Sequence, residues 1–219
     1  SRKKPDYDIE KGESRICIVA MGLPGSGKTK LTQALSDAIG GTREICYDKV
    51  IEKAKGEFVG YLDADDEWSE NYLSKMLELV KKNGIAFAPT RVYDENNILI
   101  KHFEGKKQGY LDLNDIGDIP CSFHPFIKKS KQKKFEEIRS KDVYNTACIL
   151  NEHNTKVSMI NGAYYKLNLQ KKSVTKEDGF AHKINLAYIK YQIKSLKNKN
   201  FKIARVFAIR RINNIKYIQ

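Results

Sequence analysis

A short apolar run that ends in a glycine-rich loop constrains this chain most. Ile16–Met21 is continuously apolar, which is typical of a buried parallel strand, and the loop Gly22–Thr29 follows directly. From Lys28 to Ala38, apolar residues then recur at helical spacing. A strand, a glycine-rich loop and a helix in this order predict an α/β fold, with a mostly parallel central sheet and flanking helices.

Composition excludes several other classes of protein. Of the 219 residues, 41% are hydrophobic and 31% are charged, with 5 prolines and 14 glycines, which indicates a folded chain and not a disordered or collagen-like one. No apolar run reaches the roughly 18–20 residues of a membrane span, and no apolar segment follows the basic N-terminal residues. The 4 cysteines are scattered without a CxxC pair, so we expect reduced thiols, no zinc site and a cytoplasmic location.

Three segments are expected along the chain. Residues 1–14 are polar without periodicity and predict a flexible arm. Residues 15–176 are expected to form an α/β nucleotide-binding catalytic domain with a Rossmann-like sheet. Residues 177–219 are expected to form a basic helical C-terminal extension.

Hydrophobic periodicity places the further elements of the domain. Apolar runs predict strands at Phe58–Leu62 and Ile85–Ala88, and a hairpin is expected about Asn96-Asn97. The predicted helices lie over Arg43–Lys55, from an N-cap at Ser69 to Asn83-Gly84, over Asp142–Leu150, and over Phe180–Ser195, with a second basic segment from Phe201.

The loop Gly22–Thr29 fits the pattern G-x-x-x-x-G-K-[ST] in full. Backbone N–H groups of such a loop can wrap a phosphate, Lys28 can reach the terminal phosphates, and the Thr29 hydroxyl can bind Mg²⁺. The loop resembles the Walker A loop of P-loop kinases, which implies ATP as cofactor, and a glycine-rich turn without a ligand is the alternative. The residues expected to bind the nucleotide are Gly22, Gly25, Ser26, Gly27, Lys28 and Thr29.

Carboxylates gather where the second predicted strand ends. Asp63, Asp65 and Asp66 follow Phe58–Leu62, and α/β sheets place their ligand crevices at this end of the strands. Neighbouring negative charges repel each other unless a cation with oxygen preference, Mg²⁺ or Mn²⁺, neutralises them. We therefore expect all three carboxylates to hold such an ion, which would bridge a nucleotide diphosphate.

Lys55–Trp68 resembles the DxD strand of family-two glycosyltransferases of the GT-A fold, in which K-G-E-[YF]-[IV]-x-[FY]-L-D-x-D-D-x-W recurs. The likeness covers roughly residues 40–176. Phe135–Glu137 and Lys141–Tyr144 are similar to the family's F-D-E…E-D-Y, and Tyr164–Thr175 is similar to its Y-R-x-H…S-x-S. The resemblance implies metal-dependent transfer of a sugar from a nucleotide-sugar donor to a hydroxyl acceptor, with Asp142 as the base and Asp66 in the catalytic set.

The chain departs from that family in its N-terminal half. The strand ending in I-P-x-Y-N and the strand ending in D-D-G-S are absent, the E-D pair is Lys141-Asp142, and the arginine is Lys166. The resemblance therefore implies a shortened GT-A sheet.

The loop and the carboxylates are too close in sequence for separate domains, so they are expected to share one sheet. Either the loop binds the diphosphate of the sugar donor, or the carboxylates serve a P-loop kinase that acts on a nucleotide, polynucleotide or small-molecule hydroxyl.

The excess of positive charge suggests a polyanionic partner. Lys and Arg number 40 against 27 Asp and Glu, a net charge of +13, and Lys183–Lys216 alternates basic with apolar residues at helical spacing. Such a surface fits nucleic acid or an anionic membrane, at which the protein would be peripheral; an ordinary solvated face is the alternative. A nucleic-acid-binding protein with inactive motifs is a third function consistent with these residues.

Overall fold

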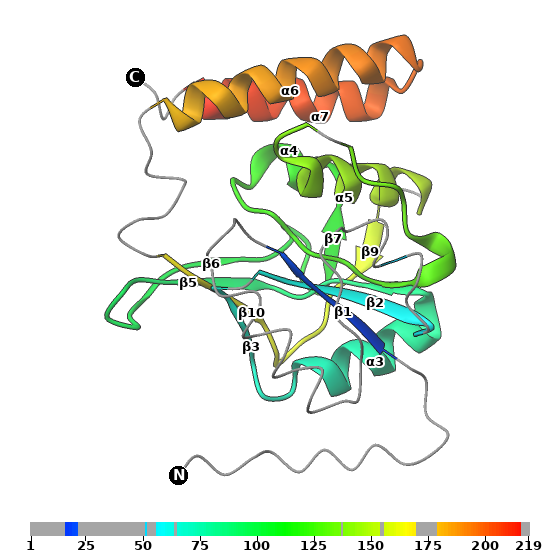
Figure 1. Ribbon diagram of the computed structural model, residues 1–219, viewed down its shortest axis with the longest axis vertical. Helices are drawn as coiled ribbons and strands as arrows, with labels where there is room; N and C mark the ends of the chain where they lie inside the picture. The colour runs from blue at the N-terminus through cyan, green and yellow to red at the C-terminus, as the bar shows by residue number, and fades with distance from the viewer. Residues whose placement is uncertain are drawn as a thin grey trace.

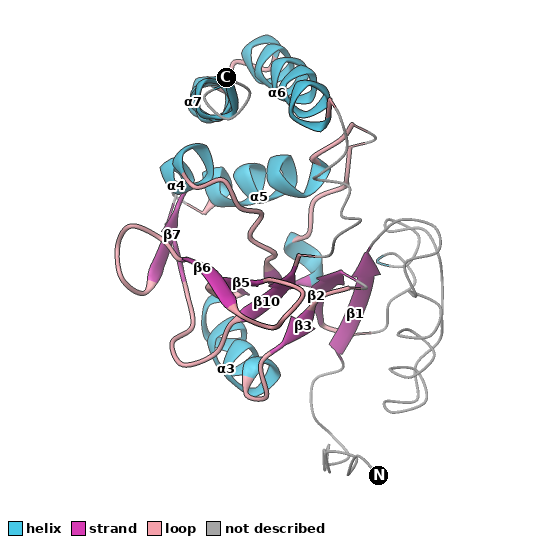
Figure 2. Ribbon diagram, turned by 90° about the vertical axis from the view of Figure 1, so that its left-hand side faces the viewer, coloured by secondary structure: helices cyan, strands magenta, loops and turns pink. Residues whose placement is uncertain are grey.

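Two sheets in the middle of the molecule are covered by helices on both faces (Figure 1). The computed structural model describes residues 16–21, 51, 56–63, 65–136, 138–153, 156–169 and 179–215. Helix α3 (Tyr72–Asn83) lies on one side of the sheets, and α4 (Leu113–Asp118) and α5 (Lys141–Glu152) lie on the other. Helices α6 (Phe180–Lys197) and α7 (Phe201–Ile215) form a hairpin that is the outermost layer (Figure 2).

The first sheet has the strand order β1-β2-β8-β4, and the second has the order β3-β10-β5-β6. The strands of the first sheet are β1 (Ile16–Met21), β2 (Phe58–Asp63), β8 (Phe126–Lys128) and β4 (Ile85–Ala86). Those of the second are β3 (Glu67–Trp68), β10 (Tyr165–Asn168), β5 (Thr90–Tyr93) and β6 (Leu99–Phe103). A further antiparallel pair consists of β7 (Tyr110–Asp112) and β9 (Lys156–Ser158), and the 3-10 turn η1 covers Lys129–Lys131.

The α/β architecture is as expected, but the prediction of a mostly parallel sheet is wrong for the described strands. The pairs β1–β2 and β10–β5 are parallel, whereas the pairings of β8, β3, β6 and β7 are antiparallel. An apolar run indicates that both faces of a strand are buried. It does not indicate whether the strand runs parallel or antiparallel to its neighbours. Because helices cover both faces here, antiparallel strands such as β8 are as apolar as parallel ones.

Alternating side chains of β2 supply both cores of the molecule. Phe58 and Leu62 belong to the cluster around α3, and Val59 and Tyr61 belong to the larger cluster on the opposite face. Between them, a Cβ at Gly60 would come 2.6 Å from the ring of Phe126 on β8. Glycine at this position therefore lets the aromatic ring pack directly on the backbone of β2.

Several predicted elements are present with shifted ends. Helix α3 begins after Asn71 and not at Ser69, whose hydroxyl instead accepts a hydrogen bond from the Tyr164 N–H at 3.0 Å. The expected hairpin joins β5 to β6, where Asp94 accepts hydrogen bonds from the N–H groups of Asn96 and Ile98. Helices α5 and α6 match their predicted ranges within a few residues, and α7 forms the second basic segment.

Other predictions fall outside the described residues. They are the arm over residues 1–14, the loop Gly22–Thr29, the helix that follows it, and almost all of the helix over Arg43–Lys55. The division into three segments remains a prediction. Among the described residues, Cys121 and Cys148 are free cysteines, and the reduced state of all 4 cysteines remains a prediction.

Arg210 of α7 fixes the C-terminal hairpin to the rest of the fold. Its buried guanidinium donates hydrogen bonds to the carbonyls of Ile116, Ile119 at 3.0 Å and Cys121 at 3.1 Å, and to the Tyr188 hydroxyl at 2.8 Å. The first two carbonyls lie at the C-terminal end of α4, where backbone acceptors lack partners within the helix. Arg210 therefore places a positive charge and hydrogen-bond donors at the C-terminal end of α4, where the helix itself supplies neither.

We expect Arg210→Met to lower the free energy of unfolding by about 3 kcal/mol or more, because three buried carbonyls lose charged donors at once. Urea denaturation followed by circular dichroism measures the change. Arg205→Met is the matched control, since Arg205 is exposed on the same helix. Equal loss of stability in the two variants would contradict the structural role of Arg210.

Candidate active site

A tight turn after β2 carries the predicted carboxylates. Asp63 is the last residue of β2, and its carbonyl accepts a hydrogen bond from the Asp66 N–H at 3.1 Å. Asp65 lies at the exposed tip of this turn, and β3 begins immediately after it. The chain thus passes from the first sheet to the second through this turn.

The strand β10 holds the turn from the second sheet. The Tyr165 hydroxyl accepts a hydrogen bond from the Asp63 N–H at 3.0 Å and donates one to Asp66 Oδ2 at 2.8 Å. The Asn168 N–H donates to Asp66 Oδ1 at 2.9 Å, and the Asn168 side-chain amide donates to the Asp65 carbonyl at 2.9 Å. Both carboxylate oxygens of Asp66 therefore bind groups of the protein itself, which distinguishes Asp66 from its two neighbours.

Burial is the main cause of the shifted pKa of Asp66. It raises the pKa of this carboxyl to about 7, with smaller increases from the charges of Asp63 and Asp65. The hydrogen bonds from Asn168 and Tyr165 stabilise the charged form and oppose the increase only in part.

A histidine and a further carboxylate act on Asp63. His124 Nε2 is 3.7 Å from Asp63 Oδ2, and the imidazole is 7% exposed and packs on the Tyr165 ring at 4.9 Å between centroids. Burial raises the pKa of Asp63, and so do the charges of Asp142 and Asp65, whereas His124 lowers it. Asp142, in the first turn of α5, is thus close enough to act electrostatically on Asp63.

Asp63 and Asp65 offer an incomplete set of metal ligands. Across the described ranges, no three His, Cys, Asp or Glu side chains are arranged to hold a metal ion. The exposed Asp65 and the carboxylate of Asp63, which His124 compensates only in part, nevertheless suit an oxygen-preferring cation whose other ligands come from phosphate oxygens. The residues therefore fit a Mg²⁺ or Mn²⁺ ion that binds together with a nucleotide diphosphate.

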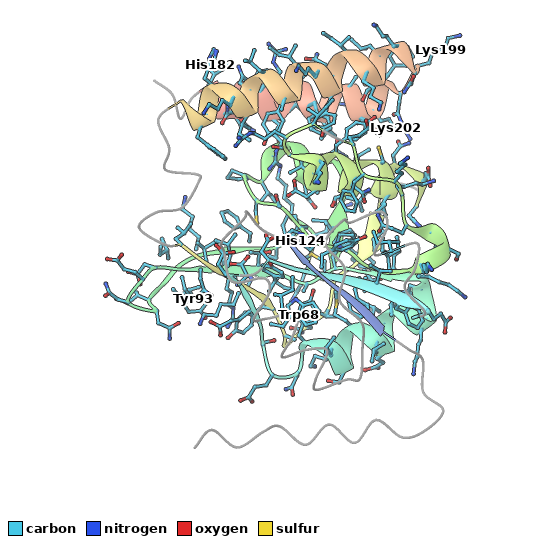
Figure 3. All side chains as sticks on the ribbon, viewed as in Figure 1. Trp68, Tyr93, His124, His182, Lys199 and Lys202 are labelled. Carbon is cyan, nitrogen blue, oxygen red and sulfur yellow. The ribbon has the colours of Figure 1, made fainter. Side chains whose placement is uncertain are left out.

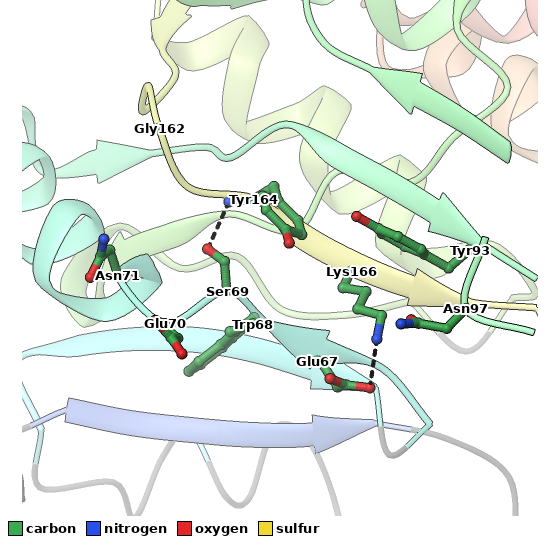
Figure 4. Close-up of a pocket in the computed structure, with 10 residues that line it drawn as sticks. All are labelled: Glu67, Trp68, Ser69, Glu70, Asn71, Tyr93, Asn97, Gly162, Tyr164 and Lys166. Atoms are coloured by element: carbon green, nitrogen blue, oxygen red, sulfur yellow. Dashed lines mark hydrogen bonds and ion pairs between the residues drawn. The ribbon is translucent and has the colours of Figure 1, made fainter. Parts of the chain in front are cut away.

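A pocket of about 430 Å³ begins directly after the carboxylate turn (Figure 4). On its wall, Lys166 Nζ lies 3.1 Å from Glu67 Oε1 and 5.2 Å from the centre of the Tyr93 ring. Its lining is formed by Glu67, Trp68, Ser69, Glu70, Asn71, Tyr93, Asn97, Gly162, Tyr164 and Lys166. Aromatic surface with a few charged and amide groups suits a polar ring-shaped ligand such as a sugar.

The structure brings Asp63, Asp65, Asp66 and Asp142 into one region, although they come from two separate parts of the chain. The loop residues Gly22–Thr29 lie outside the described residues, but β1 ends with Met21 opposite Asp63.

Sequence analysis missed His124, and it gave no function to Tyr165 or Asn168. Tyr165 and Asp63 are 102 residues apart, and no spacing rule connects them. Figure 3 shows His124 and Trp68 near the centre of the molecule.

Comparison with known proteins identifies a family pattern in the middle of the chain. Residues 45–151 match the family described as Glycosyl transferase family 2, a range that includes the carboxylate turn and Asp142. The putative teichuronic acid biosynthesis glycosyltransferase TuaG of Bacillus subtilis (strain 168) is 37% identical over 46 residues, which are 21% of this chain and 18% of TuaG.

Solved structures extend the likeness to most of the chain. The crystal structure of S. aureus TarS 1-349 has a TM-score of 0.54 at 14% identity, over 90% of this chain and 62% of that one. The same protein in complex with UDP-GlcNAc has a TM-score of 0.51 at 12% identity, over 80% of this chain and 56% of that one. The chain thus has the fold of a part of TarS and spans less than two thirds of these relatives.

Because the pKa of Asp66 is raised to about 7 in the folded protein, Asp66 binds a proton more tightly there than in the unfolded chain. We expect its contribution to the free energy of unfolding to fall as the pH rises from about 4 to 7, by up to about 3 kcal/mol. Asp66→Asn should remove this part of the pH dependence.

Urea denaturation across this pH range measures the difference between Asp66→Asn and the parent. Glu70→Gln is the control, because Glu70 is an exposed carboxylate a few residues away. A pH dependence of stability that is the same in the parent and Asp66→Asn would contradict the assigned protonation of Asp66.

Proposed function

We propose that this chain is a glycosyltransferase that moves a sugar from a nucleotide-sugar donor to a hydroxyl group of an acceptor. The observation that carries the proposal is the match of residues 45–151 to Glycosyl transferase family 2, since this range spans the carboxylate turn and Asp142. The electrostatic effect of Asp142 on Asp63 supports a single site for both.

The donor diphosphate is proposed to bind at the turn between β2 and β3. Of the three carboxylates expected to hold Mg²⁺ or Mn²⁺, Asp63 and Asp65 would do so. We move Asp66 from the metal and catalytic sets to a positioning role, because both of its oxygens accept hydrogen bonds from Tyr165 and Asn168 and so would keep the turn in shape. A bound divalent ion supplies positive charge to the leaving diphosphate. A uridine nucleotide is the first donor class to test, because the structurally similar TarS is known as a complex with UDP-GlcNAc.

Asp142 is proposed as the general base. In the transfer, the acceptor oxygen bonds to the anomeric carbon, the bond from that carbon to the diphosphate breaks, and Asp142 takes the hydroxyl proton. Its place in the first turn of α5 suits a carboxylate, because the helix N-terminus carries partial positive charge.

The glycine-rich loop is proposed to contact the same diphosphate. Met21, which precedes this loop in the sequence, is paired with Asp63 across the parallel strands, so β1 ends beside the carboxylate turn. The donor would then be bound in part by this loop, through Gly22, Gly25, Ser26, Gly27, Lys28 and Thr29.

ATP-dependent kinase activity at this loop is the less favoured alternative. No observation favours a nucleic-acid-binding protein with inactive motifs. We retain the cytoplasmic location as a prediction.

A nucleotide that binds the folded protein should raise its unfolding temperature, and a ligand at about 100 times its dissociation constant adds roughly 2.7 kcal/mol of stability. We expect UDP and a UDP-sugar to stabilise the protein, and Mn²⁺ to increase that effect. Asp65→Asn should lose the Mn²⁺ increment, whereas Glu78→Gln, at an exposed carboxylate of α3 outside the pocket, should keep it. Stabilisation by ATP with Mg²⁺, and by no UDP ligand, would replace the glycosyltransferase by the kinase.

Asp142→Asn should reduce turnover by about 10²–10⁴-fold while donor affinity changes little, because a general base acts on the acceptor and not on donor binding. Release of UDP from a panel of UDP-sugars, with water as acceptor, measures turnover without knowledge of the natural acceptor. Glu152→Gln, at the exposed C-terminal end of the same helix, is the matched control. Unchanged turnover in Asp142→Asn would exclude Asp142 as the base.

A further inference from the structure

The α6–α7 hairpin has a one-sided charge balance. Residues 179–215 contain 6 lysines and 3 arginines but no aspartate or glutamate. Three of these cations act within the protein. Arg210 binds carbonyl groups, Lys194 Nζ lies 2.5 Å from Glu136 Oε1, and Arg211 donates a hydrogen bond to the Gln192 side chain at 2.7 Å. The exposed cations are Lys183, Lys190, Lys197, Lys199, Lys202 and Arg205.

Large apolar side chains are exposed on the same hairpin. Their exposed fractions range from 38% for Ile215 to 67% for Phe201. The full set is Leu186, Ile193, Leu196, Phe201, Ile212 and Ile215. The inner side of the hairpin buries a separate set of residues, among them Tyr188, Tyr191 and Phe207.

Basic and apolar residues alternate along one stripe of α6. Lys183, Leu186, Lys190, Ile193 and Lys197 follow each other at spacings of three and four, which places them on one side of the helix. All five are exposed. This stripe differs from an ordinary solvated helix face, on which charged residues gather apart from the apolar ones.

Helix α7 adds a similar stripe to an outward-facing layer. Phe201, Arg205 and Ile212 lie on one side of α7, and all three are exposed. Figure 2 shows the hairpin outside α4 and α5, and in Figure 3 His182 and Lys199 project on the side turned away from the sheets. We define the docking face by Lys183, Leu186, Lys190, Ile193 and Lys197 of α6 with Phe201, Arg205 and Ile212 of α7.

We propose that the docking face binds the surface of a lipid bilayer that contains anionic headgroups. The lysines and Arg205 would pair with headgroup phosphates, and the aliphatic side chains would enter the boundary between headgroups and acyl chains. A nucleic acid would satisfy the cations but would leave the exposed aliphatic side chains in water. Within the described part of the chain, no helix is long and apolar enough to cross a bilayer, so the hairpin would lie on the membrane.

Vesicle co-sedimentation tests this proposal without a donor or acceptor, so its outcome is independent of the proposed glycosyl transfer. The full chain should bind vesicles of phosphatidylcholine with phosphatidylglycerol and should not bind phosphatidylcholine alone. The triple variant Lys183→Gln, Lys190→Gln, Lys197→Gln should bind about 100-fold more weakly, and added salt should weaken binding of the parent.

An apolar triple variant separates a bilayer from other polyanions. Leu186→Asn, Ile193→Asn and Ile212→Asn together keep every charge and should weaken vesicle binding at least about tenfold. The control Lys81→Gln, Lys82→Gln, Lys107→Gln removes the same charge from exposed sites outside the hairpin and should bind within about twofold of the parent. Each variant should keep the unfolding midpoint of the parent, because every substituted side chain is exposed.

Three results would overturn the proposal. The first is equal binding to vesicles with and without phosphatidylglycerol. The second is an apolar variant that binds vesicles as the parent does, which would mean a site for polyanions such as duplex DNA. The third is a parent protein that does not bind vesicles and is a dimer, together with an apolar variant that is a monomer. That result would make this face an interface between copies of the chain.

Discussion

One hydroxyl group joins the two sheets at the point where the chemistry is placed. Tyr165, on the second sheet, accepts a hydrogen bond from the last N–H of β2 and donates one to Asp66 on the other side of the turn. The pairing of Tyr165 with Trp68 holds the next strand in register. Tyr165 thus binds the turn at both ends, and Asn168 of the same strand holds Asp66 and the Asp65 carbonyl, so the positions of Asp63 and Asp65 depend on β10. Without this support, mutual repulsion would favour a turn that separates the carboxylates.

The electrostatics of the turn explain why such a costly arrangement is useful. Asp63 is partly buried, which raises its pKa; the nearby charges of Asp142 and Asp65 raise it further, while His124 offsets only part of this. A group whose charged form is disfavoured by its surroundings gains most when a cation arrives. The turn therefore carries more negative charge than its surroundings neutralise. A divalent ion that binds with a diphosphate is the kind of ligand that would supply the missing positive charge.

The sequence predicted the parts of the fold that local pattern controls. The strands at Phe58 and Ile85, the hairpin at Asn96-Asn97 and the helices after Asp142 and Phe180 are present because apolar period and turn residues are local properties. Strand direction was mispredicted, because burial makes the antiparallel strand β8 as apolar as its neighbour β2 in the first sheet. The site was found in part: the clustered carboxylates are visible in sequence, whereas Tyr165 and His124 reach them only through contacts between distant residues.

The C-terminal hairpin is coupled to the carboxylate turn through backbone contacts. Arg210 binds the carbonyl of Cys121, and the Thr146 hydroxyl of α5 binds the carbonyl of Phe123 at 2.9 Å, immediately before His124. Because both anchors hold carbonyl groups, the segment that carries His124 is restrained from two helices. The docking face and the turn thus belong to one packed unit. If that face rests on a bilayer, the carboxylates take a fixed height and orientation above it, so an acceptor held in the membrane would meet the donor in a constant geometry.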